Sequence, residues 1–305
     1  MSTKLFSKLT PEQHKRLLGV IAILLVVTIY AANFVAIRYS VLRGLTFLNL
    51  TALRFSVAGL FMLPYFCRLD FRDLGGLGWK RALLLTCLAG SPYIVIFFLG
   101  ISLAPASHGA VLNPGIIPSV VFLGTVFLGL QSFTLKQAVS LIAITLGVAL
   151  VTASSFSLQG SVVFGDLLLL ITGISWGLFT LLTKLWELKP LQITAVVSVI
   201  SLLYLPPYLL FVYDGFEGIS ATHVLVQAFF QGIVLSVGTL YLATYAVQSL
   251  GAQTTSLFSP LVPILTTLIA VPLLREIPTP LQWIGIVLVV VGMLSATKIN
   301  SEKSE

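Results

Sequence analysis

Charged residues are scarce in this chain. They make up 9% of its 305 residues, whereas about 25% is usual for a soluble domain. Apolar residues account for 57%, and the mean hydropathy is +1.05. So few charges cannot hydrate the surface of a soluble protein of this length. The composition therefore excludes the soluble classes and indicates a polytopic membrane protein.

Cysteines and catalytic motifs are scarce as well. Cys67 and Cys87 fall at or inside apolar runs, where packing is favoured over a disulfide, and neither has metal-ligand spacing. The sequence contains no Walker phosphate loop, no His-Glu-x-x-His or Gly-x-Ser-x-Gly motif, and no paired carboxylates inside an apolar run. We therefore expect neither an enzyme nor a resident metal or cofactor.

Long apolar runs are abundant. Each spans roughly 20 residues, which is the length of helix that crosses the hydrocarbon core of a bilayer. They predict an all-α polytopic membrane protein with ten transmembrane helices, at residues 17–37, 46–66, 81–100, 107–129, 137–154, 166–184, 192–212, 224–247, 253–274 and 281–297.

The basic residues are unevenly divided between the two sides of the membrane. If the N-terminus is cytoplasmic, the inside segments hold 13 Lys and Arg residues and the outside segments hold only Arg38, Arg43 and Arg275. The positive-inside rule then predicts two cytoplasmic termini. The net charge of +7 thus reflects contact with a lipid bilayer and not a nucleic-acid partner. Short loops without a eukaryotic sorting signal favour the bacterial inner membrane.

The sequence repeats itself weakly. Residues 103–152 recur 145 positions later, so that Pro118 matches Pro263, Gly147 matches Gly292 and Gln131 stands opposite Glu276. Internal repeats in a membrane protein are typical of transporters.

Each copy holds five spans, an odd number, so the second copy enters the membrane from the opposite side. The prediction is two inverted five-helix repeats with a solute site between them near the midplane. The expected divisions are a cytoplasmic N-terminal segment, the first repeat, a linker, the second repeat and a cytoplasmic tail, at 1–16, 17–154, 155–165, 166–297 and 298–305.

Prolines occur at similar places in both copies. Pro114 and Pro118 lie in the fourth run, and Pro260 and Pro263 lie in the ninth. A proline removes a backbone donor, which a membrane helix tolerates where the freed carbonyl meets protein or a water-filled cavity. We expect these prolines to break or gate their helices at the centre; kinks that serve packing alone are the alternative.

Small residues mark the fifth and tenth runs. Gly147, Gly285 and Gly292 would let neighbouring helices approach closely. Packing within the chain is the favoured interpretation, and a homodimer contact through these two spans is the alternative.

Several of these segments together resemble the EamA-type drug/metabolite transporter family. They are Tyr-Ala-Ala-Asn-Phe at 30–34, Leu-Arg-Phe at 53–55, Ser-Trp-Gly at 175–177 and Arg-Glu-Ile-Pro-Thr at 275–279, with the two matched proline segments. The resemblance implies a plasma-membrane carrier, typically an exporter of amino acids or other small metabolites, with a cavity between its repeats. The chain departs from the family pattern at 130–131, which is Leu-Gln where Gly-Glu is frequent, and at 30–31, which is Tyr-Ala where Trp-Gly is usual.

Arg54 is the single charge well inside a predicted span. A charge at that depth costs about 2.5–3.5 kcal/mol on insertion scales, which makes it a functional candidate. It could bind a substrate carboxylate, form a structural or gating contact, or extend toward the interface. Other candidates for solute binding are polar or aromatic residues in the spans, each with packing or an interhelical bond as its alternative: Tyr30, Asn33, Tyr93, Asn113, Trp176, Tyr241 and Tyr245.

Two titratable residues lie at predicted span ends. His108 could exchange a proton near neutral pH, although an ordinary interfacial histidine is the default interpretation. Glu276 is expected to pair locally, beside Arg275, or to cap the tenth span, and loss of its counterpart at Gln131 weakens a proton-linked role there.

The sequence therefore predicts a secondary-active transporter of small amphipathic metabolites, most simply an exporter of neutral amino acids or related compounds that works by alternating access. The fourth and ninth spans, with the third and eighth, are expected to close around the solute. The alternatives are an exporter of lipophilic drugs or amines, and a membrane channel or sensor that transports nothing.

Overall fold

The computed structural model describes residues 11–130, 134–155, 160–213 and 215–302, and all regular elements in those ranges are helical. The apolar runs form helices because a bilayer interior offers no partners for backbone N–H and C=O groups. The helices are α2 (Pro11–Leu42), α3 (Phe47–Phe66), α4 (Trp79–Ala89), α5 (Ser91–Leu103), α6 (Ala106–Phe127), α7 (Leu135–Ser155), α8 (Gly160–Leu185), α9 (Pro190–Ile200), η1 (Ser201–Tyr204), α10 (Leu205–Phe211), α11 (Ala221–Phe229), η2 (Phe230–Gly238), α12 (Thr239–Leu250), α13 (Ala252–Ser256), α14 (Leu261–Leu274) and α15 (Pro280–Glu302).

Nine helical stretches within the described residues are long and apolar enough to cross a membrane. They correspond to the first nine predicted spans. The tenth run forms α15, whose apolar part, Pro280–Ser295, is shorter than the other nine stretches. By length and composition the structure thus provides nine candidate spans and one shorter apolar helix.

Some of these stretches are not single helices. The third predicted span divides at Gly90 into α4 and α5, and the seventh passes through the 3₁₀ turn η1. A Cβ atom on Gly90 would lie 2.5 Å from both Ser201 Oγ and the Thr86 carbonyl oxygen, so a larger residue cannot fit there. The Ser91 N–H donates to Ser201 Oγ at 2.9 Å, which holds the two irregular segments together.

The prolines behave differently in the two halves. Pro114 and Pro118 do not break α6, which is continuous from Ala106 to Phe127. Each proline removes only one backbone bond, and close packing of α6 on α8 maintains the helix around it. In the second half, Pro260 follows the turn that separates α13 from α14, and Pro263 lies in the first turn of α14. The expected helix break is therefore found at Pro260 and is absent at the two prolines of α6.

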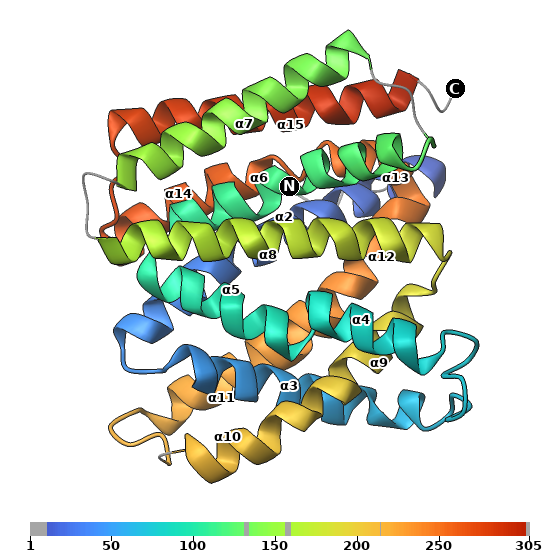
Figure 1. The fold of residues 1–305 in the computed structure, drawn as a ribbon, viewed down its shortest axis with the longest axis vertical. Coiled ribbons are helices and arrows are strands. Elements are labelled where there is room, and N and C mark those ends of the chain that lie inside the picture. Colours follow the sequence, from blue (N-terminus) through green and yellow to red (C-terminus); the bar gives the residue numbers. More distant parts are fainter. Residues whose placement is uncertain (1–10, 131–133, 156–159, 214, 303–305) are drawn as a thin grey trace.

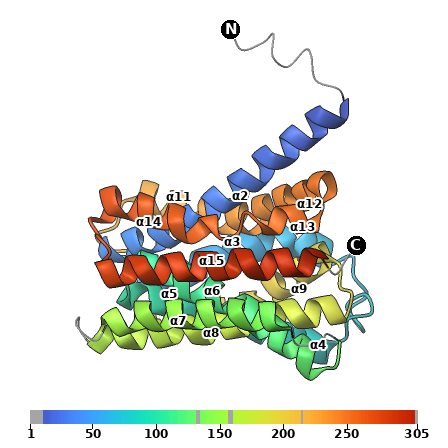
Figure 2. The same ribbon diagram turned by 90° about the horizontal axis from the view of Figure 1, so that it is seen from above.

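Helices α7 and α15 lie side by side along one edge of the bundle (Figure 1). A Cβ atom on Gly147 would lie 2.6 Å from the Gly285 carbonyl oxygen, and one on Gly292 would lie 2.7 Å from Ile144 Cγ1 and 3.0 Å from the Ser140 carbonyl oxygen. The small residues of the fifth and tenth runs thus bring these two helices together within one chain. In the perpendicular view, the first part of α2 extends beyond the other helices (Figure 2).

The helix contacts follow one pattern in both halves. Helix α8 packs on α6 and α5, and α2 packs in the same way on α14 and α12. Helix α3 packs on α9, and α7 packs on α15. Exchanging the two halves converts the contacts of α8 into those of α2 and leaves the α3–α9 and α7–α15 pairs unchanged, as expected for two related units.

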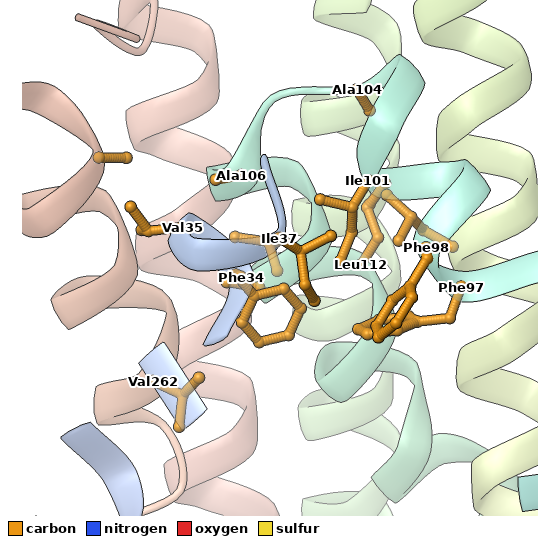
Figure 3. Packing of buried hydrophobic residues seen from close by; sticks show 14 of the residues in the cluster. Phe34, Val35, Ile37, Phe97, Phe98, Ile101, Ala104, Ala106, Leu112 and Val262 are labelled. Atoms are coloured by element: carbon orange, nitrogen blue, oxygen red, sulfur yellow. The ribbon is translucent and has the colours of Figure 1, made fainter. Parts of the chain in front are cut away.

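A compact apolar cluster fills the centre of the bundle between α2, α5 and α6 (Figure 3). The rings of Phe34 and Phe97 meet edge to face with their centroids 5.7 Å apart. Ile101 and Leu112 are completely buried beside them. Because Phe34 is one helical turn from Arg38, this cluster occupies the interior beneath the end of the bundle where α2 ends and α6 begins.

Candidate functional site

A cavity of about 540 Å³ opens between the two halves of the bundle. Its walls come from α2, α3, α4, α8, α9, η2 and α12, and they include Tyr30, Arg54 and Trp176. The cavity follows α8 from Trp176 to Lys184 and reaches Pro190 at the start of α9. Neither α6 nor α14 contributes to this cavity, so the four candidate prolines do not line it.

Arg54 points into a buried polar layer instead of toward the interface. Its Nη1 donates to Gln231 Oε1 at 3.3 Å, and Gln231 Nε2 donates to Asn33 Oδ1 at 2.9 Å. The titratable side chains that interact electrostatically with the guanidinium are the phenols of Tyr93 and Tyr30. Arg54 therefore stands on the cavity wall, positioned by a neutral amide.

Asn113 and Tyr93 lie behind the cavity wall. Asn113 Nδ2 donates to Thr172 Oγ1 at 3.0 Å, which links α6 to α8. The Tyr93 ring stacks on Phe97, and its centroid lies 5.4 Å from that of Trp176. Asn33, Asn113 and Tyr93 are all buried. They support the residues that face the cavity, and a direct role for them in solute binding stays a prediction.

The two tyrosines of α12 do not line this cavity. Tyr241 is 72% exposed on the outside of the bundle, and Tyr245 packs against the apolar core. The cavity face of η2 and α12 carries Ser236, Leu240 and Ala243. Each residue of an α-helix is rotated by about 100° from the one before it. Tyr241 and Tyr245 therefore lie about 100° or more around the helix axis from the face that lines the cavity.

Gln231 was not among the candidate residues named from the sequence. It is completely buried and lies in η2, a π-helical segment. Such segments are rare and are frequent at functional sites. Gly232, the next residue, lies directly against Val57 of α3, so Gln231 is held close to Arg54. A buried glutamine within an otherwise apolar run was the signal that could have identified it.

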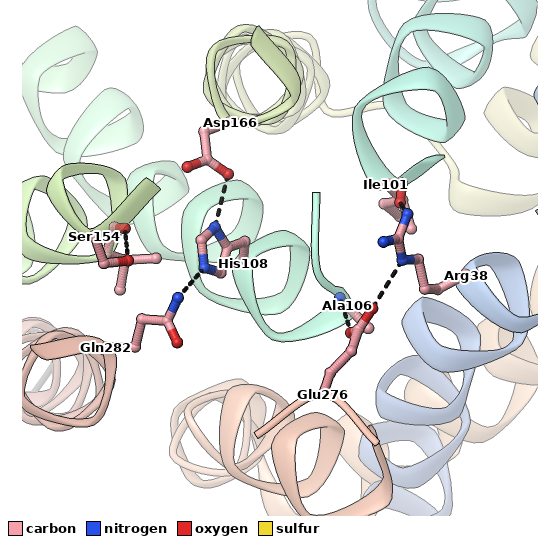
Figure 4. Close-up of polar contacts among 9 residues, drawn as sticks. Arg38, Ile101, Ala106, His108, Ser154, Asp166, Glu276 and Gln282 are labelled. Atoms are coloured by element: carbon pink, nitrogen blue, oxygen red, sulfur yellow. Dashed lines mark hydrogen bonds and ion pairs between the residues drawn. The ribbon is translucent and has the colours of Figure 1, made fainter. Parts of the chain in front are cut away.

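Two polar clusters lie at the end of the bundle where α2 ends and α6, α8 and α15 begin, which we call the Arg38 end (Figure 4). In the first, Arg38 Nε donates to Glu276 Oε1 at 2.8 Å and Glu276 Oε2 accepts the Ala106 N–H at 2.8 Å. The prediction that Glu276 pairs locally was wrong: its partner is Arg38, which helix packing brings across the bundle, while Arg275 ends α14 in a left-handed conformation.

The second cluster surrounds His108, which is buried and not interfacial. His108 Nδ1 lies 2.9 Å from Asp166 Oδ1, and its Nε2 lies 2.7 Å from Gln282 Nε2. Gln282 Oε1 already accepts the Thr279 N–H, so its NH₂ group faces the imidazole. Nε2 must then accept and Nδ1 must donate to Asp166. This arrangement fits a neutral imidazole that joins α6, α8 and α15.

The opposite end of the bundle, where α8 ends and α9 begins, is called here the Lys184 end. If Tyr30 is matched with Trp176, Arg38 corresponds to Lys184 and Asp166 to Val20. Under the shift of 145, Glu276 corresponds to Gln131 and His108 to Gln253. Gln131 lies outside the described residues, but its identity shows that the acidic partner of the Arg38 end has no counterpart here.

The sequence was compared with known proteins. The model of the EamA-like transporter family matches residues 17–153 and 163–297. The chain belongs to the EamA-like transporter family. The predicted resemblance is thereby confirmed, and the two separate matches fit its two-repeat organisation.

As a member of this family, the chain is a multi-pass membrane protein of the transporter type. No curated protein matches it. Among solved structures, 13 chains match; one crystal structure, described only as a protein, aligns with a TM-score of 0.59 at 19% identity over 94% of this chain and 96% of its own. At that identity the likeness supports the fold alone.

Proposed function

We propose that this EamA-like transporter is a secondary-active carrier, in the exporting direction, of small amphipathic metabolites that bear a carboxylate, a class that includes the neutral amino acids. The observation that carries the proposal is Arg54, an arginine on the wall of a cavity between the halves, without a carboxylate partner among the described residues. The aromatic rings of Tyr30 and Trp176 supply the apolar surface that such a solute needs.

Alternating access is supported by the difference between the two ends. At the Arg38 end, none of the residues of the two polar clusters lines the cavity. At the Lys184 end, the cavity reaches residues that are exposed, such as Lys184 and Pro190. In the orientation that the charge distribution predicts, with inverted repeats and both termini in the cytoplasm of a bacterial cell, this conformation faces inward.

Proton coupling through the Arg38 end is part of the proposal. Protonation of His108 at Nε2 would place one donor against another at Gln282, and protonation of Glu276 would weaken its bond to Arg38. Either event loosens contacts that hold α15 to the rest of the bundle.

A homodimer through α7 and α15 would have to use their outer faces, because their glycine faces already meet each other.

The proposal is tested by counterflow in proteoliposomes. Vesicles that contain the purified chain are loaded with mixed unlabelled metabolites and exposed to labelled solutes of each class. Saturable exchange of a carboxylate-bearing class supports the carrier. Flux without saturation or counterflow would indicate a channel, and exchange of lipophilic amines alone would support the alternative substrate class.

A further inference from the structure

The charges that line the cavity are all positive. Arg54 lies on its wall and Lys184 lies at its mouth, and none of the Asp and Glu side chains that the structure describes contributes to the lining. The three ion pairs among the described residues involve neither of these cations. Along the backbone of α8, Lys184 lies about two helical turns, or about 12 Å, beyond Trp176.

Four of the described acidic residues have partners away from the cavity. Asp70 and Asp73 accept backbone N–H groups in their own loop, and Asp166 and Glu276 belong to the Arg38 end. Glu187 is the nearest acid to Lys184 in sequence. It sits in an exposed left-handed turn after α8 and does not line the cavity.

The repeat offers a reason why Lys184 has no acidic partner among the described residues. Its counterpart Arg38 pairs with Glu276, and the residue that corresponds to Glu276 in the first copy is Gln131. The acid that neutralises one cation is thus missing from the sequence position that would neutralise the other. A second positive charge is left at the entrance to the site.

We propose that the cavity selects organic anions over zwitterions and amines. The anionic group binds Arg54, an apolar or aromatic body lies against Tyr30 and Trp176, and Lys184 attracts the anion at the mouth. This inference rests on the proposed transport function and narrows its substrate class. A cation within low-dielectric walls, Arg54, and a second cation at the mouth, Lys184, create a positive potential that concentrates anions. An ammonium group would meet like charges and, among polar side chains, mainly hydroxyls such as Thr180 and Ser198.

A matched set of three probes tests the charge preference. The compounds 3-phenylpropanoate, phenylalanine and 2-phenylethylamine share an aromatic body and differ in net charge. Their apparent affinities are measured by the quenching of tryptophan fluorescence in nanodiscs that contain the full chain, with counterflow inhibition in proteoliposomes as a second readout. We expect the anion to bind at least about tenfold more tightly than the zwitterion, which corresponds to 1.4 kcal/mol, and the amine to bind weakest.

Variants of Arg54 and Lys184 test whether these two cations cause the preference for anions. Arg54→Gln should weaken binding of 3-phenylpropanoate by about 30-fold or more, because it removes a buried charge contact. Arg54→Lys keeps the charge and should retain part of the affinity. Lys184→Gln changes an exposed position, where folding is not at risk. It should weaken binding of 3-phenylpropanoate by about two- to fivefold and make that binding less dependent on salt concentration. Lys189→Gln is the matched control, since Lys189 is exposed at the same end and does not line the cavity.

The outcomes separate this inference from the transport function. Equal affinities for the three probes, or tighter binding of phenylalanine or the amine, would overturn the anion preference. Equal effects of Lys184→Gln and Lys189→Gln on binding of the anionic probe would also overturn it. The same holds if none of the three probes gives a response. The carrier itself would still stand if other labelled metabolites exchanged saturably in the same vesicles.

Discussion

The two ends of this bundle are built on one plan and differ in their polar residues. At the Arg38 end, Arg38 pairs with Glu276 and the buried His108 joins Asp166 to Gln282. At the Lys184 end, the corresponding positions hold Lys184, Gln131, Gln253 and Val20, and a cavity reaches the surface. The comparison teaches that the end with the ion pair and the buried histidine is the one that the cavity does not reach.

The largest expected effect comes from breaking the buried contact at the Arg38 end. Asp166→Ala leaves the His108 Nδ1–H without its carboxylate acceptor inside the protein, which should cost about 3 kcal/mol of folding free energy. The measurement is thermal or denaturant unfolding of the purified chain in detergent.

Its matched control is Val20→Ala at the corresponding position of the other half, where a partly buried aliphatic side chain loses two methyl groups. That change should cost about 1.5 kcal/mol or less. Equal losses of stability for the two variants would show that the two ends do not differ as the contacts suggest.

A smaller effect is expected from Glu276→Gln. The amide can still accept the Ala106 N–H, but the charge-assisted bond to Arg38 is lost, which should cost about 1.5–3 kcal/mol. The Arg38 end should then open more than about tenfold more often.

Opening of the Arg38 end is measured as the rate at which a reporter cysteine reacts with a membrane-impermeant maleimide. The reporter is Ser107→Cys, a buried position at this end, in a background of Cys67→Ser and Cys87→Ser, since both native cysteines are free and exposed. Glu217→Gln, an exposed acid outside both clusters, is the control. An unchanged labelling rate in Glu276→Gln would remove the Arg38–Glu276 pair from any gating role.

The smallest effect is expected from making the Lys184 end more like the Arg38 end. Gln131→Glu supplies the acid that the first repeat lacks; the expectation rests on the sequence match, because Gln131 lies outside the described residues. A pair with Lys184 at an exposed site should stabilise closure by about 0.2–1 kcal/mol.

This variant should slow maleimide labelling of Ser198→Cys, a position on the cavity wall, by up to about fivefold, and the effect should weaken as salt is raised. The double variant Gln131→Glu with Lys184→Gln should label at the rate of the reporter alone. Slower labelling that persists without Lys184 would contradict the pairing.

Much of the fold could be predicted because it depends on local hydrophobicity. A run of about 20 apolar residues has no alternative to a helix in a bilayer, so the positions of nine candidate spans followed from the sequence. Tyr30, Arg54 and Trp176, which line the cavity, were among the sequence candidates for solute binding. Each differs from its surroundings, as a charge or as an aromatic group in a repeated motif.

The contacts of the candidate site could not be predicted to the same depth. The bond between Arg38 and Glu276 joins residues on helices far apart in the chain, and nothing near either residue identifies its partner. Tyr241 and Tyr245 were placed in the site because they are aromatic, but the rotation of α12 directs other residues to the cavity. Helix rotation depends on close contacts such as Gly232 against Val57, which involve side chains from both helices.

The sequence by itself determined that this chain is a helical membrane protein, that it contains two related halves, and that Glu276 of the second half is matched by Gln131 in the first. These properties depend on composition and on residue identity at matched positions. The tertiary structure alone decided that Arg54 stands against Gln231 without a carboxylate, that His108 is buried between three helices, and that the cavity reaches one end. Such properties depend on which side chains meet when helices pack, because a charge is compensated or left free only by the neighbours that packing gives it.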